Sequence, residues 1–303
     1  MPLTCAISVC VPTYNRPELL ERLVSGFGEQ TFSNFELVFI DDGSSVPVEP
    51  VLRDKIRRYP CLKWRCVRVP NGGRARALNL AFDVCRGELV VIFDDDDVML
   101  PKGLEALWNA WNAIPAPERA AYCGVVGLCS DPHGAIIGDT FPDVSDTTFA
   151  ALRYVYGVRG DKKEAIRRDL LAQFRFRVYP GERRCPTSSL FLWLSQSYRV
   201  RAINVPCAVK ECRVDGLSRN IVKVRRESAR TTQEFYGQAL IADVRVPLRQ
   251  RILWASNLQR FRLHRLGLGW PETRRIGANL VASAIGLPVG TGMWLLDRAR
   301  RFR

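Results

Sequence analysis

The chain has 303 residues, of which 47% are hydrophobic and 25% charged, a composition typical of a globular protein with one large or two small domains. Its formal net charge is +14, and much of the excess lies in residues 245–303, where 12 arginines stand against Glu272 and Asp297. Such a basic segment suits an anionic membrane surface or nucleic acid. The ten cysteines form no C-x-x-C pairs and only two histidines are available, which argues against a zinc site.

The first half of the chain alternates between apolar strand-like runs and amphipathic helical segments. We expect strands at 6–11, 35–40, 64–69, 88–93 and 122–129. We expect helices at 16–27, 73–85 and 101–113, where apolar residues recur at helical spacing. Each strand ends in a polar or glycine-rich turn, so the pattern predicts an α/β fold with a mostly parallel sheet flanked by helices.

The second half is less regular. We expect helices at 145–155, 162–174, 188–197 and 217–242, and a strand at 201–213. From Leu248 to Leu266 arginines point in most directions, which favours a helix at a membrane interface over a packed core helix. The predicted organisation is a catalytic domain at 1–243, divided into halves 1–140 and 141–243, followed by a helical, basic extension at 244–303.

A run of four aspartates follows the apolar strand that begins at Glu88. Carboxylates this close repel one another unless a cation lies among them, and hard divalent cations prefer oxygen ligands. Asp94 and Asp96 alternate along the chain and are predicted to face one ion, Mg²⁺ or Mn²⁺, with Asp97 as a further ligand and Asp95 pointing away. Ligands of open α/β sheets bind at the carboxyl ends of the strands, which is where this run lies. The alternative is an acidic turn solvated by water.

Several of these segments together resemble one enzyme family. The segments I-S-V-C-V-P-T-Y-N-R-P-E-L-L, F-E-L-V-F-I-D-D-G-S-S, N-G-G-R-A-R-A-L-N-L-A-F and F-D-D-D-D-V occur in the order found in family 2 glycosyltransferases of the GT-A fold. The last resembles the D-x-D metal motif of that family. A later segment, R-A-I-N-V-P through D-G-L-S-R-N, is similar to bacterial members that build surface polysaccharides.

The resemblance implies a nucleotide-sugar donor and places its binding residues. The nucleoside base is expected near Pro12, Tyr14, Asp41 and Asp42. The turn before the helix at 73–85 is expected to bind phosphate through free backbone N–H groups, Gly73 and Arg74. The further residues assigned to donor binding are Asn15, Arg16, Asn79, Asp94 and Asp95. The expected reaction is an inverting transfer, in which the divalent cation neutralises the leaving diphosphate.

The residue expected to act as general base differs in type from that of the family. Relatives carry a Pro-Glu dipeptide before the apolar helix that matches 188–197, whereas this chain has Thr187 and Ser188 there. Neither hydroxyl is a base near neutral pH. Glu182 and Asp215 are the two candidates that we consider, each with the alternative of a solvated surface carboxylate. A donor-binding homologue with weak or no activity is the corresponding alternative for the whole chain.

Other functional classes fit less well. A nucleotidyltransferase or a dinucleotide dehydrogenase needs a glycine-rich loop after the first strand, which P-T-Y-N-R-P lacks. A nucleic-acid-binding protein is not expected, because the basic residues alternate with leucines and precede an uncharged run. Processive synthases carry a Q-x-x-R-W motif, which is absent, so transfer of a single sugar is expected to a glycan or lipid-linked acceptor.

The segment Ile276–Leu296 contains no charge over 21 residues, and arginines flank both ends. Pro288 and four glycines make a straight membrane-spanning helix less favourable, and the flanking charges give no outward end. We therefore expect an interfacial or hairpin helix on an anionic membrane surface, with a core helix as the alternative. No signal peptide is visible at the start, so the predicted location is cytoplasmic, peripheral or monotopic at the inner face of the cell membrane.

Overall fold

A computed structural model describes residues 5–143, 146–182, 184–210, 221–266 and 279–299. The chain divides into two compact units. The first consists of Met1–Thr148, Val158–Phe176 and Tyr198–Arg213, and the second of Phe149–Gly157, Arg177–Ser197 and Val214–Arg303. The extension predicted at 244–303 therefore belongs to a larger unit, together with segments that were expected in the catalytic domain.

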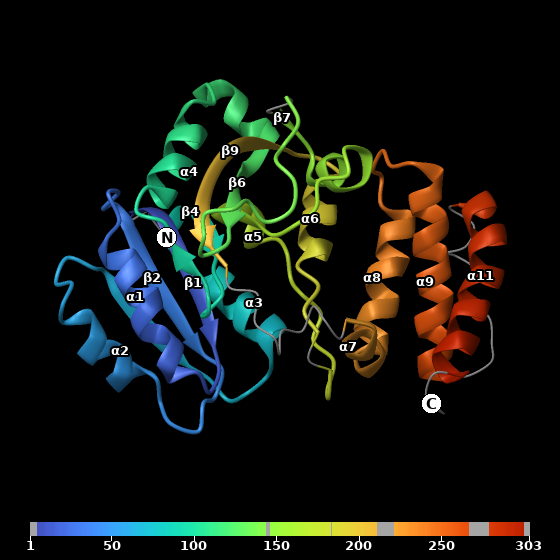
Figure 1. The fold of residues 1–303 in the computed structure, drawn as a ribbon, viewed down its shortest axis with the longest axis horizontal. Helices are drawn as coiled ribbons and strands as arrows, with labels where there is room; N and C mark the ends of the chain where they lie inside the picture. The colour runs from blue at the N-terminus through green and yellow to red at the C-terminus, as the bar shows by residue number, and fades with distance from the viewer. Residues whose placement is uncertain (1–4, 144–145, 183, 211–220, 267–278, 300–303) are drawn as a thin grey trace. The chain divides into compact units, whose positions relative to one another are not determined.

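The first unit is built on a mixed sheet that has nine strands among the described residues, and Figure 1 shows its labelled strands. Its order is β3-β2-β1-β4-β8-β6-β9-β5, with β7 paired to β9. The strands are β1 Cys5–Thr13, β2 Phe35–Asp41, β3 Trp64–Arg68, β4 Gly87–Ile92, β5 Val98–Met99, β6 Tyr122–Ser130, β7 Asp146–Thr147, β8 Lys162–Arg167 and β9 Arg199–Val209. Strands β3, β2, β1 and β4 run parallel, as the alternating pattern predicts, whereas β8 is antiparallel to β4 and β6.

Helices cover both faces of the parallel part because its strands are apolar on both sides. Leu20, Leu23 and Phe27 of α1 (Leu20–Gly28) pack with α4 (Gly103–Asn112) in the main core, which also contains Val91 and Phe93. Helix α3 (Arg74–Val84) packs against β1 and β2. The short helices of this unit are η1 Pro17–Leu19, α2 Glu49–Ile56, η2 Ala116–Ala121 and α5 Arg168–Leu171.

The helix predicted at 162–174 is wrong. Lys162–Arg167 forms strand β8, and only Arg168–Leu171 is helical. Lys, Glu, Ala and Arg favour helices locally, but this segment lies between β4 and β6 and pairs with both. The hydrogen bonds of two neighbouring strands therefore override the local propensity. The helix predicted at 145–155 is reduced, among described residues, to β7 and the π-helical turn η3 Ala151–Val155.

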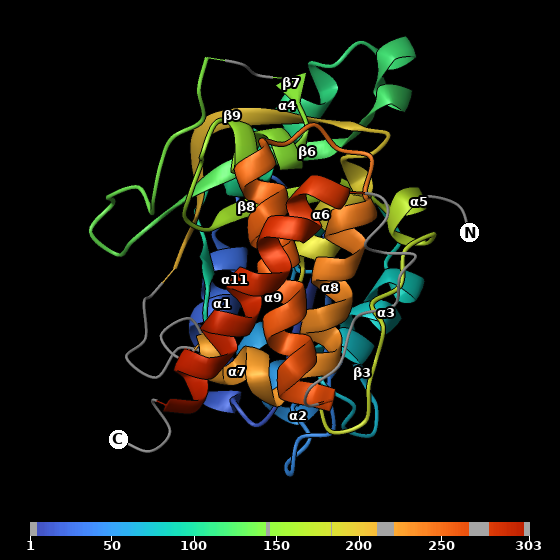
Figure 2. The same ribbon diagram turned by 90° about the vertical axis from the view of Figure 1, so that its right-hand side faces the viewer.

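The second unit is helical, with α6 (Ser188–Leu194), α7 (Ile221–Glu227), α8 (Ala229–Ile241), α9 (Leu248–Leu266) and α11 (Leu280–Ala299). The single helix expected at 217–242 is interrupted at Ser228, whose φ of −114° and ψ of 50° are not helical. Figures 1 and 2 show α8, α9 and α11 side by side.

The expectation of an unpacked interfacial helix at 248–266 is wrong, because this segment forms the packed helix α9. Its Trp254, Leu258 and Phe261 are buried against Phe235 and Tyr236 of α8. Partners within the unit accommodate its arginines. Arg260 makes a two-pronged ion pair with Asp297 of α11, at 2.7 and 2.5 Å, and Arg251 donates to the Val244 carbonyl at 2.8 Å. A paired arginine can lie on a packed face, which the sequence pattern alone did not indicate.

Helix α11 approaches α9 through small residues, and most of its larger apolar residues other than Leu287 and Trp294 are exposed. A Cβ placed on Gly290 would lie 2.1 Å from the Ser256 carbonyl oxygen, so glycine permits the close approach of the two helices. The exposed large side chains of α11 are Leu280, Val281, Ile285, Val289, Leu295 and Leu296, and we call these six the α11 apolar stripe. In the part of the chain that the structure describes, α11 alone has the length and hydropathy of a membrane-crossing helix.

Candidate functional site

The candidate site lies where the parallel strands end. Register places Thr13 of β1 beside Asp41 of β2, and Cys10 beside Ile92 of β4. The loops after β1, β2 and β4 therefore leave the same edge of the sheet. This is the edge at which open α/β sheets bind their ligands.

The aspartate run after β4 separates by side-chain direction. Ligand atoms of Asp94, Asp96 and Asp97 lie within 4.8 Å of one another, a spacing at which the three carboxylates could share one cation. Asp95 points elsewhere: it accepts hydrogen bonds from Thr13 Oγ1 at 2.9 Å and from Arg16 at 3.1 Å. Three oxygen donors suit Mg²⁺ or Mn²⁺, so the side chains present fit the predicted divalent ion.

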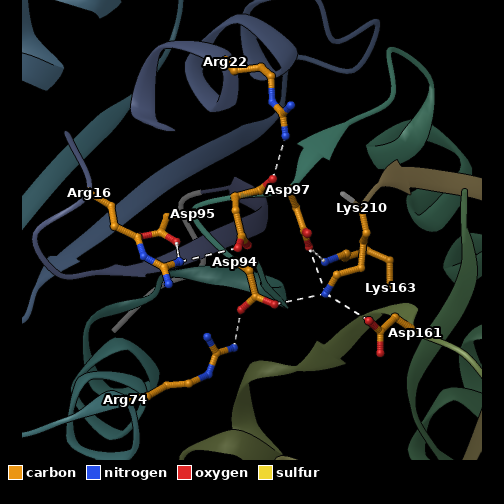
Figure 3. Close-up of polar contacts among 10 residues, drawn as sticks. Arg16, Arg22, Arg74, Asp94, Asp95, Asp97, Asp161, Lys163 and Lys210 are labelled. Carbon is orange, nitrogen blue, oxygen red and sulfur yellow. Dashed lines mark hydrogen bonds and ion pairs between the residues drawn. The ribbon is translucent and has the colours of Figure 1, made fainter. Parts of the chain in front are cut away.

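Positive side chains surround the carboxylates, as Figure 3 shows. Arg74, the first residue of α3, lies 2.5 Å from Asp94, and Lys210 lies 3.2 Å from Asp94 and 3.4 Å from Asp97. Burial alone would raise the pKa of Asp94, but Arg74 and Lys210 outweigh it and hold that pKa well below its usual range. Asp94 is therefore ionised at any physiological pH.

Asp97 belongs to a buried ion pair. Lys163 of β8 lies 3.0 Å from it, both side chains are almost completely buried, and the ammonium lies 4.3 Å from the centroid of the Phe93 ring. Burial raises the pKa of Asp97 despite the opposing charge of Lys163. Because Asp97 and Lys163 neutralise each other, Asp97 is less available than Asp94 and Asp96 to bind a cation. Asp94 and Asp96, which are both more exposed than Asp97, are the carboxylates best placed to hold the ion.

The loop after β2 is organised by two buried carboxylates. Asp41 accepts a hydrogen bond from the Ser44 backbone N–H at 2.9 Å. Asp42 accepts hydrogen bonds from the N–H groups of Gly72 and Gly73, at 2.9 and 2.8 Å. The expectation of free N–H groups for phosphate at this turn is therefore wrong for these two glycines, because both N–H groups already donate to the Asp42 carboxylate. Arg74 is the member of the turn that reaches the aspartate run.

The loop after β1 contains the remaining predicted donor residues. Pro12 is within β1, and Tyr14 is 48% exposed. Asn15 has a φ of 53° and its side chain accepts from the Ser45 N–H at 2.7 Å, which ties this loop to the one after β2. Arg16 bridges Asp95 and Asp96. The structure thus gathers these residues with the aspartates at one edge of the sheet.

Asn79 and Glu182 each have structural partners of their own. Asn79 exchanges two hydrogen bonds of 2.8 Å with the backbone of Phe176, so it fixes that segment. Glu182, in the second unit, accepts from the N–H groups of Arg230 and Thr231, at 2.9 and 2.7 Å, and thereby caps α8. Its role as base stays a prediction. Asp215 lies outside the described residues.

Lys163, Lys210 and Asp161 were not found from the sequence. They come from β8, from the residue after β9 and from the loop before β8, and Lys210 lies 3.5 Å from Asp161. No local motif marks them. A correct assignment of β8 as a strand next to β4 would have indicated Lys163, because it places that residue beside the end of β4.

The model of the family described as glycosyl transferase family 2 matches residues 8–189, more than half of the chain. The chain belongs to glycosyl transferase family 2. A GalNAc(5)-diNAcBac-PP-undecaprenol beta-1,3-glucosyltransferase of Campylobacter jejuni is 32% identical over 129 residues, covering 41% of this chain and 38% of that protein. Glycosyltransferase GlyG of Streptococcus pneumoniae is 32% identical over 104 residues, covering 34% of each. These matches span little more than a third of the relatives' lengths.

Solved structures support the fold. A Staphylococcus aureus TarS fragment, residues 1–349, has a TM-score of 0.60 at 17% identity, covering 93% of this chain and 81% of that one. The mannosyltransferase PcManGT of Pyrobaculum calidifontis, solved with GDP-Man and Mn²⁺, has a TM-score of 0.56 at 20% identity, covering 97% and 88%. At these identities the likeness establishes the GT-A fold, which confirms the predicted fold class.

Proposed function

We propose that this protein transfers one sugar, with inversion, from a nucleotide-diphosphate sugar to a glycan or lipid-linked acceptor in cell-surface polysaccharide synthesis. The observation that carries the proposal is the cluster of Asp94, Asp96 and Asp97, whose ligand atoms lie within 4.8 Å in a family 2 chain. We propose UDP as the nucleotide; a TarS structure contains UDP-GlcNAc, and the Campylobacter relative is a glucosyltransferase on an undecaprenol-linked glycan.

The side chains at the sheet edge have distinct parts in this reaction. A divalent ion held by Asp94 and Asp96 would neutralise charge on the departing diphosphate. Arg74 and Lys210 contribute two positive charges beside Asp94, where the diphosphate would lie. Asp41 and Asp42 hold the loops that line the proposed nucleoside position. Arg16 fixes Asp95 and thus the backbone of the aspartate run.

A screen of nucleotide sugars by thermal shift tests this assignment. UDP-glucose, UDP-GlcNAc and GDP-mannose are compared, each with Mn²⁺ and with EDTA. A ligand at about 100 times its Kd stabilises a protein by about 2.7 kcal/mol, which gives a clear shift. We expect at least one UDP-sugar to stabilise the protein only with Mn²⁺. If none of the three changes the midpoint under either condition, the proposed donor class is wrong.

We also propose that the second unit attaches the enzyme to an anionic membrane surface at the cytoplasmic face. The α11 apolar stripe is a run of exposed apolar side chains at helical spacing, and its opposite side is occupied by α9. A helix packed on one side is suited to lie in the interface with its other side in lipid. Exposed Arg298 follows the stripe and can approach anionic headgroups.

A further inference from the structure

Strand β8 places a carboxylate, Glu164, near the aspartate run. The register pairs Val126 of β6 with Glu164, and pairs Val91 of β4 with Ala165. Continuing this antiparallel register by one residue brings Glu164 level with Ile92, two residues before Asp94. Glu164 therefore lies in the part of β8 that adjoins the carboxyl end of β4.

The direction of the Glu164 side chain follows from that of the adjacent Lys163. Side chains alternate along a strand, so Glu164 and Lys163 point to opposite faces of the sheet. Lys163 is on the face of Phe93, whose ring packs against Phe27 of α1. Glu164 is consequently on the other face, the one that α3 covers over β1 and β2. Asp94 lies beyond the end of β4, and its ion pair with Arg74 places it next to the start of α3, the helix on the Glu164 face of the sheet.

The other carboxylates at this edge have partners. Asp94, Asp97 and Asp161 all contact Lys210. Asp95 is held by Thr13 and Arg16. Glu164 is partly exposed, and its carboxylate accepts a hydrogen bond from its own backbone N–H. Within the described parts of the chain, no other residue is recorded as a hydrogen-bond or ion-pair partner of this carboxylate. A partly exposed carboxylate that no other side chain holds, beside a reaction centre, is suited to act on a substrate.

We infer that Glu164 is the general base that accepts the proton of the acceptor hydroxyl, an inference that rests on the proposed function. As the acceptor oxygen forms its bond to the anomeric carbon of the donor, its proton passes to a Glu164 carboxylate oxygen. The bond between the anomeric carbon and the diphosphate breaks at the same time, and its electron pair leaves with the diphosphate. Glu164 thus fills the role for which Glu182 and Asp215 were considered.

The electrostatic setting agrees with this role. Burial raises the pKa of Glu164 to about 7, partly opposed by the positive charges of Lys163 and Lys210, while Asp161 raises it further. A base works best when its pKa is near the operating pH, because it is then sufficiently ionised and still binds a proton strongly. Turnover should accordingly rise with pH through about 7, as the carboxyl loses its proton.

The test uses the full chain with Mn²⁺ and the UDP-sugar that stabilises it, and measures UDP release with water as the acceptor. Glu164→Gln should lower the turnover number about 10²- to 10⁴-fold and abolish the rise near pH 7, with the Kd for UDP unchanged. Glu88→Gln is the matched control, because Glu88 is a partly buried strand carboxylate that accepts a hydrogen bond from Trp111. It should retain wild-type turnover.

Three results would overturn the inference. They are near-wild-type turnover of Glu164→Gln, a pH profile that the substitution leaves unchanged, or a large loss of turnover in Glu182→Gln instead. Failure of the proposed function has a different signature, since the wild-type protein would then neither bind UDP with Mn²⁺ nor release it from any UDP-sugar. A lowered thermal midpoint in Glu164→Gln would be separated from a catalytic loss by the unchanged Kd for UDP.

Discussion

At the residue scale, the pair of Lys163 and Asp97 combines stability with the geometry of the site. Both side chains are buried, with exposed fractions of 3% and 1%, and Lys163 joins β8 to the loop after β4. Removing one member of a buried pair leaves the other charge without compensation, which typically costs about 3–5 kcal/mol. The pair therefore holds the aspartate run against the sheet.

Lys163→Met should lower the free energy of unfolding by about 3 kcal/mol or more, measured by urea denaturation. Lys163→Met combined with Asp97→Asn should recover part of that loss, because no buried charge is then unpaired. The matched control is Lys223→Met, whose side chain is 73% exposed and whose ion pair with Glu227 spans 4.0 Å. Equal losses of unfolding free energy in the two single variants would contradict a special contribution of the buried pair to stability.

The sequence predicted the aspartates but not the lysines that accompany them, for a physical reason. Asp94 to Asp97 are consecutive and follow a strand, so a local pattern is enough to find them. Lys163 and Lys210 contact them across 66 and 116 residues of sequence, through a sheet order that no short segment specifies. For the same reason Asp42 was assigned to the nucleoside alone, although its carboxylate also binds the glycine turn 30 residues later.

At the scale of elements, strands β1, β2 and β4 were predictable because each is a largely apolar run bounded by a polar turn, and β3 because its apolar residues alternate with arginines. Strand β8 was not, since its residues favour a helix in isolation. Helix α9 was misjudged because Asp297, more than 30 residues later, neutralises Arg260 within the packed unit. Pairing and packing partners distant in sequence decided both outcomes.

The contact between α9 and α11 depends on glycine at one position and not at another. A Cβ on Gly290 would lie 2.1 Å from the Ser256 carbonyl oxygen, whereas a Cβ on Gly292 would meet no atom within 4 Å. Gly290→Ala should therefore destabilise by about 1–3 kcal/mol through overpacking. Gly292→Ala should stabilise by up to about 1 kcal/mol through helix propensity. Thermal unfolding of the two variants checks the difference in sign, and equal shifts would contradict this packing.

At the scale of the whole molecule, the two compact units carry different proposed tasks. The first unit holds every site side chain described at the sheet edge, and the second holds the α11 apolar stripe. The basic residues that give the chain its net charge of +14 are concentrated near that stripe in sequence. Catalysis and membrane attachment can then be tested separately.

Membrane attachment is tested by sedimentation with vesicles of phosphatidylglycerol or phosphatidylcholine. The full chain should bind the anionic vesicles, and less so at high salt, because salt screens the arginines. Val289→Asp, within the α11 apolar stripe, should weaken binding about tenfold or more. Val46→Asp is the control, since Val46 is an exposed apolar residue of the first unit, with 66% of its surface accessible. Equal binding of the two variants would exclude α11 as the attachment surface.

The central claim is that Asp94 and Asp96 bind a divalent ion through which a nucleoside diphosphate is held. Calorimetric titration of UDP into the full chain tests it most directly, with Mn²⁺ and with EDTA. Asp96→Asn is compared with Asp54→Asn, a control at a surface position where the side chain is 74% exposed. The account predicts UDP binding that requires Mn²⁺, that is weakened at least about tenfold in Asp96→Asn and that is unchanged in Asp54→Asn. UDP binding of equal strength in EDTA, or an Asp96→Asn protein that binds UDP with Mn²⁺ as tightly as the wild type, would contradict it.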